Sequence, residues 1–347
     1  MYFGELSPTA QTAYAEVFEA ASAQHLHRSV AHLTGSFAKK TVKGRLYRYF
    51  QFRDLDGRVR QIYVGPDSER IRALLDKARD EPDASVVPLA RSAMALGCQP
   101  LIPAHYRIVR RLSEWGFFNA GGALVGTHAF LAMGNMLGVT WEMGARTQDV
   151  DFAHVGKNIS IALPATAKVD VHQAIESLEM GFLPITSFKG SPGATYINPS
   201  QPDLRIDFVT TRHRGGDEPI IPEHLNVAFQ PLKFLEFLLE GPTQAVVLGR
   251  PGAVVVTIPS PERYALHKLV VYAERGRRLQ VKAGKDLHQA AALISWLQAT
   301  DPDAIVACWQ DLLSRGKGWQ TRARKGLRAL RTLDPDLAHH LPLPDPP

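Results

Sequence analysis

Residues 147–152 read Thr-Gln-Asp-Val-Asp-Phe, and this stretch decides the fold expected for the chain. Its alternation of polar and apolar residues is typical of a β-strand with one buried face. Because successive side chains of a strand point to opposite faces, Asp149 and Asp151 project together while the apolar residues beside them point into a core. Two carboxylates on one face raise each other's pKa unless a cation lies between them. The pair therefore favours a metal site, although an exposed Asp-x-Asp at a strand end is the better explanation when the motif is taken alone.

A second acidic strand follows at residues 204–210, Leu-Arg-Ile-Asp-Phe-Val-Thr. Burying Asp207 between two apolar residues is costly unless its carboxylate is paired or binds a metal. A neighbouring strand with this acid would complete a cluster of three catalytic carboxylates, Asp149, Asp151 and Asp207. We expect such a cluster to hold two Mg²⁺ ions, with Mn²⁺ as the alternative, because these cations prefer oxygen ligands. One ion would grip a triphosphate and the other would activate an attacking hydroxyl, with Asp207 as ligand and candidate base.

Residues 121–129, Gly-Gly-Ala-Leu-Val-Gly-Thr-His-Ala, predict a buried strand that breaks at a glycine and opens a helix. The break would present backbone N–H groups and the Thr127 hydroxyl at a helix N-terminus, where phosphate oxygens are stabilised. Gly126 would allow the backbone to approach the phosphate closely. Small residues at a strand–helix junction are also common in ordinary packing, and His128 is expected to pack or cap there rather than act as a base. The predicted nucleotide site thus includes Gly126 and Thr127.

These three features, in this order, resemble the DNA polymerase beta nucleotidyltransferase superfamily. Within it, the chain looks like a bacterial nucleotidyltransferase-fold family at residues 124–129, 147–152 and 261–269, and at a tyrosine-rich hairpin that ends in Gly65-Pro66. The resemblance implies an α/β (α+β) fold with a polymerase-beta-type core and a mixed sheet. It also implies transfer of a nucleoside monophosphate from a nucleoside triphosphate, such as ATP, to an acceptor hydroxyl with release of pyrophosphate.

The chain departs from the superfamily pattern in two places. The hydroxyl residue of the turn is Thr127 rather than serine. The interval from Gly126 to Asp149 is long, which predicts an insertion that loops out around residues 141–146.

The C-terminal half is similar to abortive-infection-type nucleotidyltransferases, some of which act as toxins on transfer RNA. The likeness lies in lysine and Lys-Asp positions within residues 265–287. It implies that Lys268 contacts the triphosphate, that Lys285 lies at the nucleotide site, and that Asp286 orients a basic residue. An amphipathic helix with its lysines in water explains these residues nearly as well, and Arg275 is expected to be solvated.

Three units are expected along the chain. Residues 1–100 predict an N-terminal domain with a helix capped by Ser7 and a β-hairpin over residues 45–64. Residues 101–225 predict the nucleotidyltransferase catalytic core. Residues 226–347 predict a mostly helical C-terminal domain that also contributes two short strands.

The net charge of +6 suits a partner rich in phosphate without requiring one. Two basic segments could together line a groove for RNA, transfer RNA first: the hairpin and a C-terminal helix. Their basic residues are Arg45, Arg48, Arg53, Arg58 and Arg60 in the hairpin, and Lys317, Arg322, Arg324, Lys325 and Arg328 in the helix. A half-buried hairpin and a solvated helix explain the same patterns.

Several classes of protein are disfavoured. Two distant cysteines, Cys98 and Cys308, make no disulfide framework, and the N-terminus lacks a signal-peptide layout, so a cytoplasmic location is expected. The uncharged stretch from Trp115 to Trp141 is long enough to span a bilayer. It contains six glycines, however, so a strand, a turn and a helix explain it better and no membrane association is expected.

Two other functions stay open. The chain could bind nucleotide or nucleic acid without turnover, which the presence of all three acids argues against. It could instead transfer a nucleotide to a protein or a small molecule. Whether the basic C-terminal segment lines the same cleft as the acids distinguishes this last function from transfer to RNA.

Overall fold

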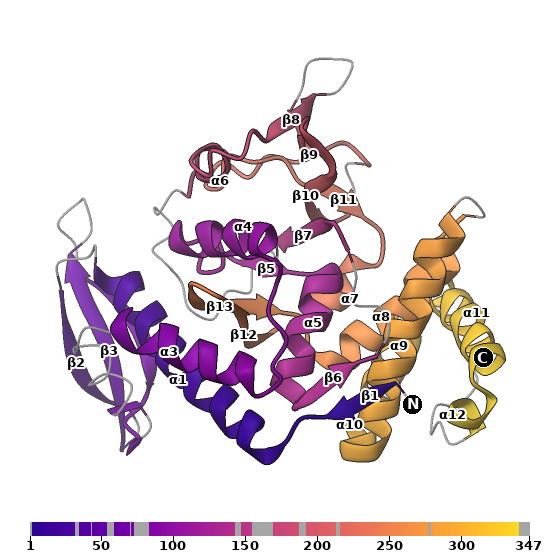
Figure 1. The fold of residues 1–347 in the computed structure, drawn as a ribbon, viewed down its shortest axis with the longest axis horizontal. Coiled ribbons are helices and arrows are strands. Elements are labelled where there is room, and N and C mark those ends of the chain that lie inside the picture. The colour runs from indigo at the N-terminus through magenta and orange to yellow at the C-terminus, as the bar shows by residue number, and fades with distance from the viewer. Residues whose placement is uncertain are drawn as a thin grey trace.

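The two acidic strands lie side by side in the central sheet of the computed structural model (Figure 1). The structure describes residues 2–31, 35–42, 44–53, 59–69, 71–72, 83–142, 147–154, 169–186, 192–212, 216–276 and 279–339. Strand β7 (Asp149–His154) pairs in parallel with β10 (Gln201–Thr211), and the register sets Asp151 opposite Asp207. This pairing brings two motifs that are more than fifty residues apart in the sequence onto one face of the sheet.

The central sheet is mixed, as predicted. Its strands run in the order β5–β7–β10–β9–β8, and β11 also pairs with β10. The β7–β10 and β10–β11 pairs are parallel and the other described pairs are antiparallel. The remaining strands are β5 (Gly122–Leu124), β8 (Leu183–Thr186), β9 (Pro192–Asn198) and β11 (Gln230–Leu232).

The apolar residues of the acidic strands form the main core. Phe152 and Phe208 are fully buried and stack with ring centroids 5.6 Å apart, and Phe117 packs edge-on against both. Burying one such side chain stabilises the fold by about 1.5–3 kcal/mol. Helix α5 (Gly126–Leu137) packs against β7. Helices α4 (Pro103–Glu114) and α6 (Val171–Glu176) pack against each other, and their apolar residues belong to the same core. The alternation read from the sequence therefore places aromatic rings in the core and carboxylates outside it.

The N-terminal region contains two helices and a small sheet. Helix α1 (Pro8–Ala31) is capped by Ser7, whose Oγ accepts a hydrogen bond from the Ala10 N–H at 3.2 Å, which confirms the predicted cap. The predicted hairpin is also confirmed, as strands β3 (Arg45–Arg53) and β4 (Val59–Pro66). Strand β2 (Gly35–Val42) was not predicted; it pairs with β3 and completes a three-stranded antiparallel sheet. The predicted basic residue Arg58 lies outside the described residues.

A second apolar cluster joins the N-terminal helices to a hairpin from the C-terminal half. Helices α1 and α3 (Asp83–Ala95) pack against strands β12 (Thr243–Gly249) and β13 (Gly252–Ile258). Alternate residues of this hairpin face the N-terminal helices and the main core, which explains its continuous apolar sequence. The N-terminal helices thus share a core with residues beyond 240, and the domain boundaries expected at residues 100 and 225 stay predictions.

The loop expected around residues 141–146 is wrong at its first residue. Trp141 belongs to strand β6 (Val139–Trp141), which pairs antiparallel with β1 (Phe3–Glu5). Its ring stacks on Phe130 at 4.5 Å between centroids, and its Nε1–H donates to the Phe130 carbonyl at 2.7 Å. The ring contact and the hydrogen bond of Trp141 hold this strand in place. Part of the long interval between Gly126 and Asp149 is therefore a β-strand and not a loop. Residues 143–146 lie outside the described part.

The described residues from Pro261 to His339 are mostly helical, as predicted. The helices are α8 (Pro261–Glu274), α9 (Gln280–Thr300), α10 (Pro302–Ser314), α11 (Lys317–Leu333) and α12 (Pro335–His339), preceded by the short α7 (Leu235–Leu239). Helix α8 packs against both α9 and α11. Gly326 allows the close approach of α11, because a Cβ there would lie 2.4 Å from the Leu269 carbonyl oxygen. Among the helices within the described ranges, none combines the length and apolar character needed to traverse a bilayer.

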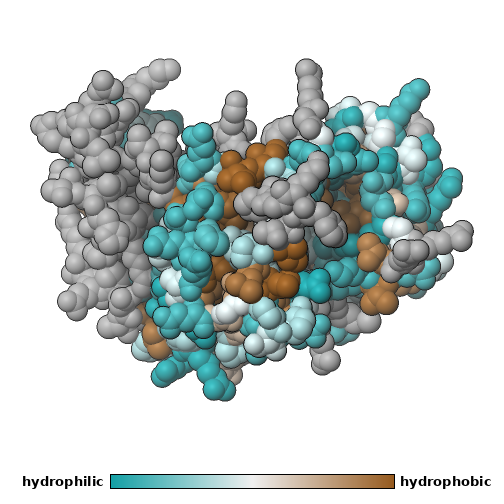
Figure 2. Space-filling model, turned by 90° about the horizontal axis from the view of Figure 1, so that it is seen from above, coloured by the Kyte–Doolittle hydropathy of each residue, from teal (hydrophilic) through white to brown (hydrophobic). Residues whose placement is uncertain are grey.

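Figure 1 places the arginine-rich β3–β4 hairpin and the basic helix α11 at opposite ends of the longest axis of the molecule. A groove lined by both segments would therefore have to run along most of the molecule, and the RNA groove considered from the sequence stays a prediction. Seen from above, apolar residues gather over the middle of the molecule between hydrophilic flanks (Figure 2). Leu183 and Ile185 of β8 are 57% and 43% exposed, so the outer strand of the sheet contributes apolar surface.

Candidate active site

The three predicted carboxylates project from adjacent strands on the same face of the sheet. Asp149 and Asp151 lie two residues apart in β7, and Asp207 of β10 is the register partner of Asp151. All three residues are half-buried. Burial raises the pKa of Asp151 to about 6, and the neighbouring carboxylates of Asp207 and Asp149 act in the same direction. The electrostatic repulsion expected from the sequence is thus present in the structure.

Gly126 brings the start of α5 against Asp151. Its φ of +62° lies in the left-handed region, and a Cβ at this position would lie 2.1 Å from Asp151 Oδ2. The Val125 N–H donates to the Asp151 carbonyl at 3.0 Å, so the turn is tied to β7 through the backbone as well. Only glycine satisfies both the conformation and the space. The structure therefore brings together the predicted phosphate turn and the predicted metal carboxylates.

Thr127 connects α5 to the C-terminal helices. It is 5% exposed, and its hydroxyl accepts a hydrogen bond from Gln289 Nε2 of α9 at 3.4 Å. The Tyr264 hydroxyl of α8 lies 2.8 Å from the Gly126 carbonyl oxygen and 2.9 Å from Gln289 Oε1. Sequence reasoning missed Tyr264 and Gln289, for which the only signal was polar groups on otherwise apolar helix faces. The contact of Thr127 with phosphate stays a prediction.

Asp286 holds two basic side chains, Lys268 and Arg275. Its Oδ1 lies 2.7 Å from Lys268 Nζ, and its Oδ2 pairs with Arg275 Nε. Burial of Asp286, which is 2% exposed, opposes its charge, but Lys268 and then Arg275 hold the pKa of this carboxyl below its usual value. Lys268 also lies 5.1 Å from the Tyr264 ring centroid. Asp286 therefore orients Lys268, in line with the role implied by the resemblance.

The interpretation of these residues as solvated lysines and arginines does not fit Lys268 and Arg275. Their side chains are 12% and 24% exposed and both are paired with Asp286. A helix that only displayed charge to water would leave them free to extend into solvent. Arg275, expected to be solvated, instead helps to fix the carboxylate that holds Lys268.

Lys285 and Lys282 complete the basic side of the site. Lys285 is half-buried, and burial lowers its pKa; neighbouring Lys268 also lowers it, whereas Asp151 raises it. Lys282 Nζ lies 3.3 Å from Asp149 Oδ2. The side chains of α8 and α9 thus set ammonium groups opposite the carboxylates of the sheet. This arrangement suits an anion with several charges together with cations that neutralise the acids.

The donor set fits Mg²⁺ or Mn²⁺ in chemical kind. Oxygen-only ligands are what these cations prefer. Burial is the main cause of the raised pKa of Asp151, and the repulsion from Asp207 and Asp149 that adds to it is what a divalent cation would relieve. Within the described part of the chain, no three His, Cys, Asp or Glu side chains are gathered closely enough to hold an ion. Asp149 instead faces Lys282, and Asp207 accepts a hydrogen bond from the Thr195 hydroxyl at 2.5 Å. Thr195, the register partner of Asp207 on β9, was missed by sequence reasoning.

A buried histidine pair lies behind the start of α5. His128 Nε2 and His105 Nδ1 are 2.7 Å apart, and the two residues are 1% and 2% exposed. Burial lowers the pKa of His105 to about 4 and of His128 to about 3, so both rings are neutral near pH 7. This packing agrees with the expectation that His128 packs or caps by the turn, and its lack of a base role stays a prediction.

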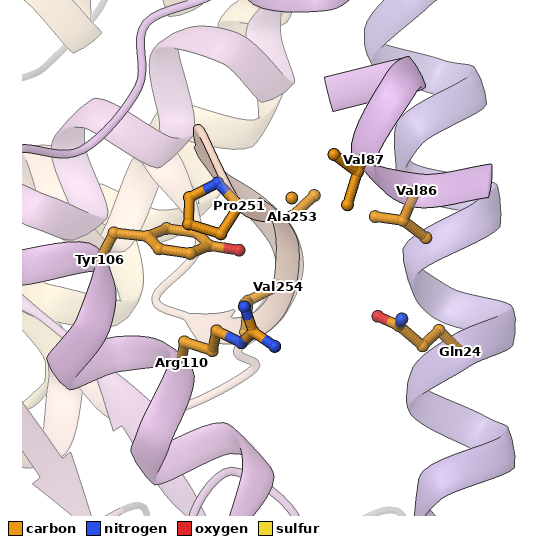
Figure 3. Close-up of a pocket in the computed structure, with 9 residues that line it drawn as sticks. Gln24, Val86, Val87, Tyr106, Arg110, Pro251, Ala253 and Val254 are labelled. Carbon is orange, nitrogen blue, oxygen red and sulfur yellow. The ribbon is translucent and has the colours of Figure 1, made fainter. Parts of the chain in front are cut away.

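A cavity of about 220 Å³ lies between α1, α3, α4 and β13, and Figure 3 shows Tyr106, Arg110 and Gln24 around it. Its lining residues are Gln24, Val86, Val87, Tyr106, Arg110, Pro251, Gly252, Ala253 and Val254. None of the predicted catalytic or nucleotide-binding residues lines this cavity. It is therefore a separate feature of the junction between the N-terminal helices and the β12–β13 hairpin.

Comparison with known proteins gives the family of the chain. Residues 104–314 match the family NTP_transf_8, described as nucleotidyltransferase. No curated protein matches the chain. Among solved structures, the chain is similar to an antigenic nucleotidyltransferase-like protein from Paracoccidioides brasiliensis, with 20% identity and a TM-score of 0.38, over 70% of this chain and 94% of that one. The family match spans more than half of the 347 residues and contains every predicted site residue, and the chain therefore belongs to this nucleotidyltransferase family.

Proposed function

We propose that this protein is a metal-dependent enzyme that transfers a nucleoside monophosphate from a nucleoside triphosphate to an acceptor hydroxyl. The observation that carries the proposal is the register of β7 and β10, which sets Asp151 opposite Asp207 beside the glycine turn of α5. A family match alone does not separate an active enzyme from a relative without turnover. Three acids on one face, opposed by lysines, are what the transfer chemistry requires.

The residues divide into an acidic and a basic group. Asp149, Asp151 and Asp207 would hold Mg²⁺ or Mn²⁺, which when bound neutralises charge on the phosphates and lowers the pKa of a bound hydroxyl. The N-terminus of α5 at Gly126 and Thr127 offers backbone donors to phosphate oxygens. Lys268, fixed by Asp286, and Lys285 offer positive charge to the triphosphate.

The reaction joins the acceptor oxygen to the α-phosphorus and breaks the bond from that phosphorus to the bridging oxygen of the β-phosphate. Pyrophosphate leaves with the electrons of that bond, and the acceptor proton passes to a carboxylate or to water. Asp207 is the proposed recipient because of its position in the sheet. It lies on β10, whereas Asp149 and Asp151 lie on β7, the strand next to β5 and the α5 turn. Its Thr195 hydrogen bond holds the side chain for that task. Catalysis then depends on positioning and charge, without a covalent enzyme intermediate.

RNA, with transfer RNA first, remains the favoured acceptor because the net charge is +6. The hairpin and α11 lie at opposite ends of the molecule, so an RNA that contacted both would have to extend along its longest axis. Helix α11 packs on α8, where Arg322 pairs with Glu274 and Lys325 Nζ donates to the Ala273 carbonyl at 2.9 Å. The basic side chains Arg322 and Lys325 of α11 are therefore directed toward α8, and their described contacts are not with the carboxylates of the sheet.

This position of α11 favours a second candidate function, transfer to a protein or small-molecule hydroxyl. Such an acceptor needs no long basic track, whereas an RNA neutralises several lysines or arginines. The two candidates share the acids and differ only in what approaches Asp207. An acceptor screen therefore separates them without changing the site.

The test incubates the full chain with Mg²⁺, each α-labelled nucleoside triphosphate, and either total RNA, protein extract or small-molecule extract. Asp151→Asn and Asp207→Asn keep the size of the side chains and remove their charge. Asp203→Asn is the matched control, because Asp203 is an exposed acid on the same strand as Asp207. Label on one acceptor class, lost in both site variants and kept in the control, supports the transferase and identifies the acceptor. Triphosphate binding without pyrophosphate release in any mixture would exclude turnover and leave a nucleotide-binding protein.

A further inference from the structure

Lys282 makes a contact that the proposed nucleotide site does not explain. It lies in the first turn of α9, and its ammonium contacts Asp149 on β7. The Nζ–Oδ2 distance is 3.3 Å, and the two side chains are 61% and 27% exposed. A mostly exposed lysine thus forms an ion pair with a carboxylate oxygen that is proposed to bind the metal.

Lys282 differs from the other two lysines of the basic group. Lys268 is 12% exposed and is fixed by Asp286, while Lys285 is half-buried. Lys282 is far more exposed than Lys268, and a flexible, exposed lysine side chain is able to change partners. An ion pair this exposed contributes little stability, so breaking it costs little.

We propose that Lys282 is an exchangeable counter-ion, which pairs with Asp149 in the free protein and moves to the triphosphate when a divalent cation takes its place. This inference rests on the proposed function, because it takes Asp149 to be a metal ligand. An ammonium and a divalent cation repel each other at one carboxylate oxygen, so the two exclude each other there. The triphosphate arrives with several negative charges and offers the displaced ammonium a new partner.

The exchange couples the two ligands. Without triphosphate, Lys282 competes with the cation and weakens its binding; with triphosphate, the same lysine contributes to the complex. Each ligand then increases the affinity for the other, as thermodynamic linkage requires. The free protein would resist loading with metal alone and would bind metal and triphosphate together.

The test compares Lys282→Ala with the wild-type full chain in two binding measurements that need no turnover. Electron paramagnetic resonance gives the affinity for Mn²⁺ alone, and calorimetry gives the affinity for the preformed Mn²⁺ complex of inorganic tripolyphosphate. We expect Lys282→Ala to bind Mn²⁺ alone about two- to fivefold more tightly, the range of an exposed ion pair. It should bind the tripolyphosphate complex more weakly, while Lys282→Arg behaves like wild type.

Opposite shifts separate the exchange from a structural role, which would change both affinities in one direction. Lys233→Ala is the matched control, since Lys233 is an exposed lysine outside the site, and it should change neither affinity. If Lys282→Ala equals this control in both measurements while Asp149→Ala abolishes Mn²⁺ binding, the counter-ion inference is wrong and the metal site stands. If the wild-type chain shows no Asp149-dependent Mn²⁺ binding, the proposed function fails and the inference fails with it.

Discussion

Replacing Gly126 by alanine tests whether the start of α5 positions the catalytic carboxylate. Two costs follow from the structure. A residue with φ of +62° costs about 1–2 kcal/mol when it carries a Cβ. The new methyl would also lie 2.1 Å from Asp151 Oδ2, whereas carbon–oxygen contacts settle near about 3.3 Å, so the carboxylate must move by about 1 Å.

The two costs have separate readouts. The backbone cost lowers the free energy of unfolding, measured by urea denaturation, by about 1–2 kcal/mol. The displaced carboxylate lowers nucleotide transfer by about 100-fold, because a shift of about 1 Å at a reacting centre has effects of that size. We expect Gly126→Ala to remain folded and to lose most of its transfer activity and its Mn²⁺ affinity.

Gly241→Ala supplies the matched control. Gly241 has a φ of +58°, and an added Cβ would meet nothing within 4 Å. This variant should show the backbone cost alone, with normal transfer. If Gly126→Ala retains transfer within about threefold of Gly241→Ala, its contact with Asp151 does not position the carboxylate and the reasoning is refuted.

Three further predictions follow from contacts in and around the site. Asp286→Asn leaves two partly buried cations without their carboxylate and should lower the free energy of unfolding by about 3 kcal/mol at pH 7, measured by urea denaturation. Because the pKa of Asp286 is lowered in the folded state, this loss should begin to shrink as the pH falls through the usual carboxyl pKa of about 4 and should disappear only below the lowered folded-state pKa; a loss that does not shrink on acidification would contradict the ion-pair origin. The pKa of Asp151 is raised to about 6, so protonation should weaken Mn²⁺ binding as the pH falls through 6. In metal-free protein, the free energy of unfolding should decrease as the pH rises from about 4 to 6. Asp151→Asn should reduce this decrease and leave the contribution of Asp207, whose pKa is also raised by burial; an unchanged decrease would assign it to another group. Gly326→Ala forces α11 away from the Leu269 carbonyl and should cost about 1–3 kcal/mol in thermal or urea unfolding, whereas unchanged stability would show that the helices separate freely.

The parts of the site that could be predicted are those that depend on local sequence. Asp149, Asp151 and Asp207 follow from period-2 alternation, and Gly126 follows from a strand that breaks into a helix. The register that sets Asp151 opposite Asp207 cannot be predicted from the sequence of either strand alone. The sequence supported only the expectation that a neighbouring strand with Asp207 would complete a cluster of three acids.

Contacts between distant elements could not be predicted. The hydrogen bonds of Tyr264 and Gln289 to the α5 turn depend on how α8 and α9 dock, which helical periodicity does not specify. The Lys282–Asp149 pair joins residues 133 positions apart. Trp141 was placed in a loop because its strand is only three residues long and finds its partner at the N-terminus.

The packing of α1 and α3 on the β12–β13 hairpin limits how the protein can be shortened. A chain that began at residue 101 would keep every proposed catalytic residue and would lose the cover of one hairpin face. Val246, Leu248 and Val255, each at most 4% exposed in the full chain, would then meet water on an antiparallel hairpin. An exposed apolar hairpin is prone to self-association. Aggregation of such a fragment would therefore result from the loss of the helices that cover this hairpin face. It would say nothing about the chemistry of the acids.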